Sequence, residues 1–388
     1  MIYISVFLSI LFCAAYAMFM FWCIAGWRTR ETKQSAPDKF QFISVIVPAR
    51  NEMDNISRCL ESICNQDYPQ ERMEVLVVDD HSTDSTSAEV AGCEKRFPGL
   101  VRLLRPGQNE GGSKKEVLSF GVKHARGEYI LTTDADCIVP NGWLKQFDSA
   151  FRNNEVQMVA APVGFTGSSI FEKIQSLEMM GLSGIAGAAI NHRLPLLCNG
   201  ANLGFRKKVF DEVGGYEKKK RVISGDDSEM MYKVHAKYPE GITYLGSREA
   251  TVYTAASRNM FSFLNQRRRW ASKIPVAVSG FTLLIAIVAW CAHAFLLFVI
   301  AQSYFYPQLR SLAMIALGMK LIPEFVFLFG MSGFFGKRDL LWLMFPAQPF
   351  YWIYIVIIGI GSPFAGFSWK GRSHRSAVEP AVNHLKND

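Results

Sequence analysis

The feature that most limits what this chain can fold into is the position of its longest apolar segments. Residues 2–27 contain no charged side chain. At about 1.5 Å of rise per residue, a helix of that length can cross a hydrocarbon core of about 30 Å. Three further apolar stretches lie near the other end of the chain, over residues 276–304, 312–335 and 340–364. Apolar segments at both ends of a globular sequence predict a domain held at a membrane.

Composition divides the chain into five parts. The first is an N-terminal transmembrane anchor, residues 1–28. Within it, Ala15-Tyr16-Ala17 resembles a signal-peptidase site, but no basic region precedes it and the apolar run continues, so we expect no cleavage. The other predicted parts are a globular domain (40–258), an amphipathic interface helix (259–275), transmembrane or re-entrant helices (276–365) and a polar tail (366–388), in which residues 370–388 are expected to be poorly ordered.

The net charge of +8 is associated with basic residues at the membrane flanks. These residues are Arg28, Arg30 and Lys33 after the anchor, and Arg267, Arg268, Arg269 and Lys273 before the next apolar stretch. The positive-inside rule places both flanks, and the domain between them, on the cytoplasmic side of an inner (plasma) membrane. The same charges would attract anionic membrane lipids. No nucleic-acid partner is expected, because no basic surface pattern interleaved with aromatic residues accompanies the charge.

The C-terminal stretches fit this topology only if one of them does not cross. Three crossings would leave the basic residues of the tail outside the cell: Lys370, Arg372 and Arg375. Pro346 and Pro349 interrupt the last stretch, which can instead be re-entrant or interfacial. Lys320 and Glu324, one helical turn apart in apolar sequence, are expected to pair with each other or to face a polar cavity.

The eight cysteines are scattered and form no C-x-x-C pair. This spacing indicates small buried residues in a reducing compartment, not disulfides or zinc ligands. The seven histidines show no metal-binding spacing either.

Within the globular domain, short apolar runs alternate with helical patterns. The runs predict strands over residues 43–47, 75–78, 101–104, 129–133 and 156–161, and the patterns between them predict helices over residues 55–66, 82–95 and 114–125. Such alternation is typical of an α/β fold with a mostly parallel sheet covered on both faces. A longer helical pattern follows over residues 170–190, and it fits either an amphipathic helix on the membrane or an ordinary core-facing helix.

Two carboxylates, Asp134 and Asp136, come at the end of the strand predicted over residues 129–133. On an extended backbone, residues i and i+2 point to the same side, so both can reach one hard cation. The carboxyl ends of strands are also where open α/β sheets bind nucleotides. The pair predicts a Mg²⁺ or Mn²⁺ site that holds a diphosphate, although a solvated pair in a turn has the same pattern when it stands alone.

Other polar residues follow strands in the same way. Asp80 can accept hydrogen bonds from a nucleobase or a ribose, or it can form an Asx turn. Asn51 and Glu52, after the first strand, are open to the same two interpretations. Lys114 follows two glycines at a helix start, where an anion fits, but a solvated surface lysine has the same pattern.

Two later segments carry the remaining candidates. Asp226 and Asp227 open a helix, where the helix dipole favours acids whatever their function, and one of them can act as a general base toward an acceptor hydroxyl. Gln266 and Trp270 lie four residues apart with Arg269 adjoining, and a cation beside an indole suits a diphosphate and a sugar ring. Membrane-flanking arginines and an interfacial tryptophan explain the last set without a ligand.

Five motifs occur together in one order. They are SVIVPARNE (44–52), VVDDHSTD (77–84), DAD (134–136), GDD (225–227) and QRRRW (266–270). This set resembles membrane-bound members of glycosyltransferase family 2, which have a GT-A catalytic domain, over residues 42–275. The resemblance implies a metal-dependent, inverting transferase. It would move a sugar from a nucleotide-sugar donor, UDP-linked by expectation, to a membrane-associated glycan or lipid-linked acceptor in cell-surface polysaccharide or glycolipid synthesis.

The resemblance also implies roles for single residues. Nucleoside- and donor-binding positions are matched by Pro48, Ala49, Asn51, Glu52, Asp80, Lys114, Asp134 and Arg269. Metal-binding positions are matched by Asp134 and Asp136, of which Asp136 is the more direct ligand, and the catalytic base is matched by Asp227. Acceptor-binding positions are matched by Asn199, Gly200, Gln266 and Trp270. Many membrane-bound relatives have Glu-Asp where this chain has Asp226-Asp227, a departure that keeps the base.

Two other functions stay open from the sequence. The Q-x-x-R-W motif is also typical of processive synthases that extend a polysaccharide and move it through their own membrane helices. The small number of apolar stretches favours single or limited addition. A catalytically silent nucleotide-binding membrane scaffold is the third possibility, against which all five motifs argue.

Overall fold

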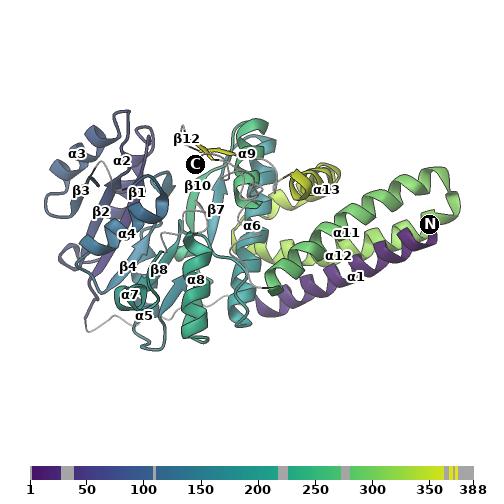
Figure 1. Ribbon diagram of the computed structural model, residues 1–388, viewed down its shortest axis with the longest axis horizontal. Helices are drawn as coiled ribbons and strands as arrows, with labels where there is room; N and C mark the ends of the chain where they lie inside the picture. The colour runs from purple at the N-terminus through teal and green to yellow at the C-terminus, as the bar shows by residue number, and fades with distance from the viewer. Residues whose placement is uncertain are drawn as a thin grey trace, which may run out of the picture.

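The structure is a computed structural model that describes residues 2–27, 39–107, 111–216, 226–271, 280–361, 367–369 and 372–374. A globular α/β domain lies at one end of the molecule, and long helices from both ends of the chain extend away from it (Figure 1). The predicted fold class is confirmed. Several flanking charges lie outside the described residues: Arg28, Arg30, Lys33, Lys273, Lys370 and Arg375.

A seven-stranded sheet, with the order β3-β2-β1-β4-β8-β6-β9, forms the centre of the domain. Its strands are β1 (Ile43–Ala49), β2 (Met73–Asp79), β3 (Val101–Leu104), β4 (Tyr129–Thr132), β6 (Met158–Ala160), β8 (Leu203–Arg206) and β9 (Ile242–Tyr244). β1 pairs in parallel with β2 and β4, β2 with β3, and β6 with β9. β8 is antiparallel to both of its neighbours. The sequence did not indicate β8, because Gly204 and Arg206 break its apolar run.

A second sheet of three short strands, in the order β5-β10-β7, was not predicted either. Its strands are β5 (Cys137–Ile138), β10 (Val252–Ala255) and β7 (Val163–Thr166). Runs of two to four residues are too short to show a period in the sequence.

The helices of the domain are α2 (Ile56–Cys64), α3 (Thr86–Arg96), α4 (Lys114–His124), α5 (Trp143–Phe151), α7 (Lys207–Glu212) and α8 (Asp226–Lys237), with short 3₁₀ turns at Gln70–Arg72 and Arg248–Ala250. The first three lie close to their predicted positions and α8 begins at the predicted Asp226, whereas α5 and α7 were not predicted. α3 begins four residues later than predicted. The Ser82 N–H donates to Asp79 Oδ1 (3.0 Å) and the Thr86 N–H to Asp84 Oδ1 (3.0 Å), which holds this segment as a turn.

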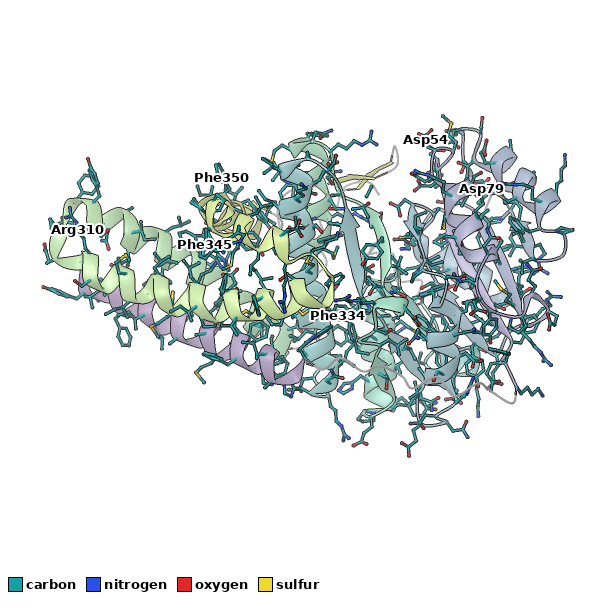
Figure 2. The ribbon with its side chains drawn as sticks, turned by 180° about the vertical axis from the view of Figure 1, so that it is seen from behind. Asp54, Asp79, Arg310, Phe334, Phe345 and Phe350 are labelled. Atoms are coloured by element: carbon teal, nitrogen blue, oxygen red, sulfur yellow. The ribbon has the colours of Figure 1, made fainter. Side chains whose placement is uncertain are left out.

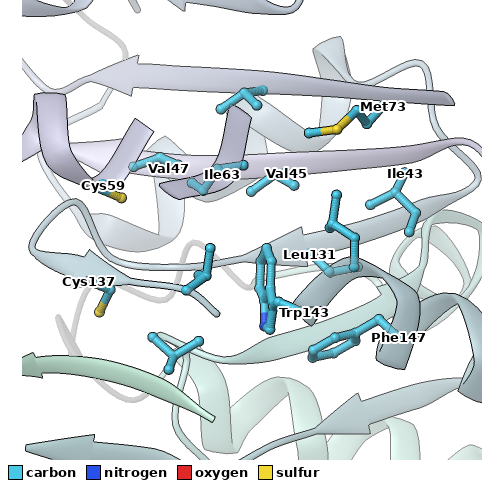
Figure 3. Packing of buried hydrophobic residues seen from close by; sticks show 14 of the residues in the cluster. Ile43, Val45, Val47, Cys59, Ile63, Met73, Leu131, Cys137, Trp143 and Phe147 are labelled. Carbon is cyan, nitrogen blue, oxygen red and sulfur yellow. The ribbon is translucent and has the colours of Figure 1, made fainter. Parts of the chain in front are cut away.

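Alternating side chains of the parallel strands cover both faces of the sheet. Ile43, Val45 and Val47 point to a core that contains α2 and the Trp143 and Phe147 rings of α5 (Figure 3). On the other face, Ile46, Leu76 and Val78 pack with Val117 and Leu118 of α4. The continuous apolar strands therefore have the two-sided burial that their sequence predicted.

α6 (Ile170–Asn191) lies between the domain and the long helices (Figure 1). Toward the domain, the hydroxyl groups of Ser176 and Ser183 donate to the carbonyls of Phe165 (3.0 Å) and Val163 (2.7 Å) in β7. Toward the bundle, a Cβ on Gly184 would meet Met331 Sδ at 2.5 Å. α6 is thus packed on two sides, which favours the core-facing interpretation over a helix lying freely on the membrane.

Three long helices run side by side away from the domain in Figure 1. They are α1 (Ile2–Gly26), α11 (Gly280–Phe305) and α12 (Arg310–Phe334), with a 3₁₀ turn at Pro307–Leu309. α1 packs against both of the others. Each is long and apolar enough to cross a membrane, and so is the segment Arg338–Ile360. Within α12, Lys320 Nζ lies 2.5 Å from Glu324 Oε2. The expectation that these two residues pair with each other is confirmed.

The last helix takes a different course. After a 3₁₀ turn (Arg338–Leu343), α13 (Met344–Gly361) is continuous through Pro349. The prediction that the prolines interrupt this stretch is therefore wrong. Pro346 is in the first turn, where no intrahelical N–H bond is lost. Figure 1 shows α13 nearly end on, unlike α1, α11 and α12. Phe345 and Phe350 mark the same helix in Figure 2.

The described part of the tail contains a small hairpin, whose second strand lies where the sequence predicted poor order. β11 (Phe367–Trp369) pairs antiparallel with β12 (Arg372–His374). β11 contacts α9 (Met260–Ala271), the helix that follows the globular domain. The chain is therefore back beside the domain after α13.

None of the eight cysteines, all of which belong to the described residues, forms a disulfide. The prediction that they are small buried residues is confirmed for all except Cys291, which is partly exposed.

Candidate functional site

A cavity lies where the carboxyl ends of β1, β2 and β4 meet. The chain runs from β1 to β2 and β3 on one side and returns to β4 on the other, so β1 and β4 flank a switch point in the strand order. Open α/β sheets bind ligands at such a point. The cavity holds about 590 Å³ including its opening to solvent. It is lined by Pro48, Ala49, Arg50, Glu52, Asp80, Lys114, Val117, Asp134, Ala135, Asp136 and Arg269.

The turn role and the ligand role that were both considered for Asp80 belong to two neighbouring aspartates, Asp79 at the end of β2 and Asp80 after it. Asp79 is the turn residue, since its carboxylate accepts hydrogen bonds from the Ser82 N–H and the Ser87 hydroxyl. Asp80 lines the cavity, and its Oδ1 accepts a hydrogen bond from the Gly112 N–H (2.9 Å). Asp80 is therefore the residue that is positioned to meet a ligand.

The β1–α2 turn is fixed by the loop after β2. Asn51 has φ +51°. Its Oδ1 accepts from the Thr83 N–H (2.9 Å), and its own N–H donates to Ser82 Oγ (3.0 Å). Asn51 thus joins the two loops and is not among the residues that line the cavity, whereas Glu52 is. Arg50, which was not singled out as a candidate, donates to the Asp80 carbonyl (2.5 Å) and also lines the cavity.

The glycine-rich turn before α4 closes on Asp80. Gly111 and Gly112 have φ values of +90° and +97°, a region that L residues rarely adopt. A Cβ on Gly111 would lie 3.1 Å from Asp80 Oδ1. The turn therefore brings the start of α4 close to the cavity, where Lys114 Nζ lies 2.5 Å from Asp134 Oδ1.

Asp134 and Asp136 both line the cavity, but not for the reason that the sequence suggested. β4 ends at Thr132, and the Cys137 N–H donates to the Asp134 carbonyl (3.0 Å), which closes a turn. The two carboxylates come together across this turn and not by alternation along an extended strand. Ala135, at the centre of the turn, is buried.

The chemistry of this cavity fits a hard cation. Four carboxylates line it, of which Asp134 and Asp136 belong to one turn, and the described residues contain no group of three or more His, Cys, Asp or Glu side chains that could hold a metal ion by themselves. Mg²⁺ is typically held by one or two carboxylates together with substrate phosphates and water. Lys114 pairs with Asp134 in the same cavity, and the expectation that Asp136 is the more direct ligand stays a prediction.

Asp227 is tied to the end of β4 through a neighbouring loop. Its Oδ2 accepts from the Gly200 N–H (3.2 Å), and the Gly200 carbonyl accepts from the Thr132 hydroxyl (2.7 Å). Asn199 accepts from the Ala201 N–H in the same loop. The loop is anchored by the fully buried Asn202, whose amide donates to Pro162 and Ala250 carbonyls. Three candidates named from sequence, Asp227, Asn199 and Gly200, thus lie together beside the cavity's β4 end.

An ion pair that the sequence gave no reason to single out holds α8 against α4. The buried Lys115, next to Lys114, pairs with Glu229, two residues after Asp227, and Glu229 also pairs with Lys233 (3.0 Å). Burial alone would raise the pKa of the Glu229 carboxyl, but hydrogen bonds from the two lysines hold it below its ordinary value. The pair fixes the helix that carries Asp227 relative to the cavity.

Replacing Lys115 with methionine is expected to lower kcat with little change in the KM for the donor. The lysine contacts the helix of Asp227 and does not line the cavity, and a misplacement of about 1 Å can cost up to ~10²-fold in rate. Steady-state kinetics of transfer would measure both constants. The matched control is Lys123→Met, an exposed position on the same helix. If Lys115→Met instead raised the KM for the donor and left kcat unchanged, this positioning role would be contradicted.

The three arginines of α9 differ in their surroundings. Arg269 lines the cavity, and Arg268 is exposed. Arg267 is buried, so its predicted role as a membrane-flanking charge is wrong. Its guanidinium binds Glu178 of α6 (2.5 Å) and Gln266 Oε1 (2.5 Å) and lies 4.3 Å from the centre of the Trp270 ring.

Arg267 therefore organises the other residues of the motif. Burial opposes its charge, but Glu178 keeps the pKa of the guanidinium above its ordinary value. Gln266 and Trp270 contact this guanidinium and are not among the cavity-lining residues, whereas Arg269 is. No local sequence signal separates Arg267 from Arg269, because both are arginines in one helix beside a tryptophan.

The comparisons with known proteins agree with this geometry. The model of glycosyl transferase family 2 matches residues 44–214, from β1 to the end of α7. The domain belongs to glycosyltransferase family 2. The mannosyltransferase PcManGT from Pyrobaculum calidifontis, solved in complex with GDP-Man and Mn²⁺, has a TM-score of 0.55 and 19% identity. The likeness covers 89% of this chain and 99% of that one, and it confirms the GT-A fold.

Two curated relatives have similar sequences. Glycosyltransferase AglE of Haloferax volcanii is 29% identical over 189 residues, which cover 48% of this chain and 59% of that protein. Beta-monoglucosyldiacylglycerol synthase of Nostoc sp. is 28% identical over 258 residues, which cover 63% of this chain and 51% of that protein. The chain thus spans little more than half the length of these relatives.

Proposed function

We propose that this family 2 protein transfers a sugar from a nucleotide-sugar to a membrane-associated acceptor. The observation that carries the proposal is the single cavity that joins Asp80, Lys114, Asp134, Asp136 and Arg269 at the switch point of the sheet. Oxygen acceptors at one side suit a nucleoside, and cations beside a carboxylate pair suit a diphosphate with its metal ion.

The proposed reaction is a single displacement with inversion. Asp227 accepts the proton of the acceptor hydroxyl while that oxygen bonds to the anomeric carbon, and the bond from this carbon to the diphosphate oxygen breaks. Lys114 and Arg269 stabilise the charge on the departing nucleoside diphosphate. A Mg²⁺ or Mn²⁺ ion held by Asp136 and Asp134 would neutralise further charge on the same group.

We also propose that α1, α11 and α12 cross the membrane and that α13 lies at its surface. The contact of β11 with α9 supports this topology, because it returns the chain to the side of the domain after α13. Basic flanks on that side support a cytoplasmic position of the catalytic domain at an inner membrane. This arrangement removes the conflict that three C-terminal crossings created for the basic tail.

The names of two relatives, which mention a diacylglycerol lipid and a poly(ribitol-phosphate) polymer, support the proposed acceptor class. The Nostoc relative is named a beta-monoglucosyldiacylglycerol synthase, and a 34% identical segment occurs in the poly(ribitol-phosphate) beta-glucosyltransferase of Bacillus spizizenii. We infer single or limited addition to a lipid-linked or glycan acceptor. A processive synthase remains the second candidate because of the Q-x-x-R-W motif, and the length of the product on a gel separates the two.

Removal of divalent metal is expected to abolish turnover of the donor. The purified protein in lipid nanodiscs would be screened against UDP- and GDP-sugars, and release of nucleoside diphosphate would be measured with EDTA, Mg²⁺ or Mn²⁺. Metal-dependent turnover of one donor supports a transferase. Binding of a nucleotide-sugar with no turnover under any condition would instead identify a catalytically silent scaffold.

A further inference from the structure

A second cavity lies within the helix bundle, on the far side of α6 from the sheet. It holds about 610 Å³ including its opening. Its lining comes from α1, α6, α12 and α13 and is mostly apolar, for example Leu177, Leu182, Phe327 and Leu328. Nothing in the proposed donor chemistry uses this space.

The depth of the cavity corresponds to a single leaflet. Its lining residues on α1, Tyr16 and Met20, come ten and six residues before the end of that helix beside the domain. On α12, Glu324 and Leu328 stand at the same two distances from Phe334, which Figure 2 places at the domain end of the bundle. At about 1.5 Å per residue these positions lie roughly 9–15 Å deep, within one half of a ~30 Å hydrocarbon core.

The charges around the cavity are already balanced. Two carboxylates line it, Glu178 and Glu324, and its lining contains no lysine or arginine among the described residues. Glu178 is paired with Arg267, and Glu324 with Lys320. The charges of Arg267 and Lys320 are already neutralised by these two carboxylates. A phosphorylated headgroup would therefore place an uncompensated negative charge in a low-dielectric site, which costs free energy. The cavity therefore favours an uncharged ligand.

The polar groups that remain suit the ester oxygens of a lipid, whose reacting hydroxyl group would lie outside this cavity. Gln348 Oε1 accepts from both Lys320 Nζ (2.5 Å) and Trp352 Nε1 (2.5 Å), so the amide N–H groups are what Gln348 can offer to a ligand. Glu324 and Tyr351 supply oxygens in the same wall. An apolar pocket with a few such groups is typical of a site for a neutral lipid.

The cavity is also linked to the donor site. Glu178 lines it and at the same time binds Arg267 of α9. Arg269, two residues further along that helix, lines the donor cavity. A lipid seated in the bundle would therefore lie against the residue that anchors the helix beside the donor.

We propose that this cavity binds an acyl chain of an uncharged, hydroxyl-bearing glycerolipid of the diacylglycerol class, and that this lipid is the acceptor. The inference rests on the proposed transferase function and names its acceptor. Phosphorylated lipids are excluded by the charge balance described above.

Photolabelling tests the binding site without any need for catalysis. The full chain with Asp227→Asn, in phosphatidylcholine nanodiscs, would be irradiated with a diacylglycerol that carries a diazirine in its acyl chain. We expect labelled peptides from the lining segments of α6, α12 and α13. Unlabelled diacylglycerol should compete, and phosphatidic acid and a polyprenyl phosphate should not. Labelling confined to the outer, lipid-exposed surface, or equal competition by either phosphorylated lipid, would overturn the proposal.

A filled cavity provides the second test. Gly181 lines the cavity, with Leu328 Cδ2 3.4 Å from the position of a Cβ. Gly181→Phe is expected to lower photolabelling and to raise the KM for diacylglycerol by about 10-fold, with the donor KM unchanged. The matched control is Ile322→Phe, at a position of α12 that is 65% exposed, and it should change neither.

The two readouts separate the lipid site from the transferase function. Slow metal-dependent hydrolysis of the nucleotide-sugar, with water as acceptor, reports on the donor site alone. Unchanged labelling and unchanged diacylglycerol KM in Gly181→Phe protein that still hydrolyses donor would contradict the lipid site. Absence of donor turnover in the wild type, with labelling still in the cavity, would contradict the transferase function and leave the lipid site standing.

Discussion

Replacing Asp227 with asparagine is expected to lower kcat for sugar transfer by ~10²–10⁴-fold, the usual contribution of a general base. Asparagine keeps the shape of the side chain and an oxygen that can accept the Gly200 N–H, so the loop after α6 should keep its position. Donor binding should survive, because Asp227 is not among the residues that line the donor cavity. Transfer kinetics and titration calorimetry with the nucleotide-sugar would measure the two effects.

The control for this experiment is Asp211→Asn, an exposed aspartate of α7. It should transfer sugar at the wild-type rate. Wild-type transfer by Asp227→Asn protein would show that the base assignment is wrong. Loss of donor binding together with transfer would mean that Asp227 supports the donor site and does not act as the base.

Replacing Arg267 with alanine is expected to destabilise the protein by about 3–5 kcal/mol, because it leaves Glu178, whose side chain is only 9% exposed, without its cation. The phenol of Tyr354 in α13 donates to the same Glu178 carboxylate. If that carboxylate moves when its cation is removed, the contact of α13 with α6 and α9 is weakened as well. Transfer should fall as well, since α9 carries Arg269 to the donor cavity. Thermal unfolding in nanodiscs, followed by tryptophan fluorescence, would measure the stability.

Its matched control is the neighbouring, exposed Arg268. Arg268→Ala should change the free energy of unfolding by no more than ~0.5 kcal/mol, as is usual for surface substitutions. The double variant Arg267→Met with Glu178→Leu should recover part of the lost stability, because it removes both charges from the site. If Arg267→Ala and Arg268→Ala unfold alike, Arg267 does not stabilise the helix junction.

The Asp134–Asp136 pair shows how a sequence pattern can find the right residues by the wrong geometry. The spacing suggested alternation on a strand, but the strand ends at Thr132 and a turn follows. The position after a buried strand was sufficient to place both carboxylates at the sheet edge. Their exact conformation depends on Cys137, whose N–H closes the turn on the Asp134 carbonyl.

The Lys115–Glu229 pair, by contrast, could not be found from the sequence. Each residue is an ordinary charged side chain in a helix pattern, and the two are 114 positions apart. Sequence reasoning therefore had no means of joining them. Only the packing of α8 beside α4 makes them partners and gives the helix of Asp227 a fixed position.

The sequence by itself determined the apolar segments, the alternation of strands and helices, and most of the polar residues that line the donor cavity between Pro48 and Asp136, although not Arg50. These features follow from local composition and period, which a chain carries wherever it folds. The tertiary structure decided which arginine of α9 is buried and which meets the donor cavity, that β8 enters the sheet antiparallel, and that α13 leaves the chain beside the domain. Burial and pairing depend on partners distant in sequence, such as Glu178 for Arg267, and no local pattern contains them.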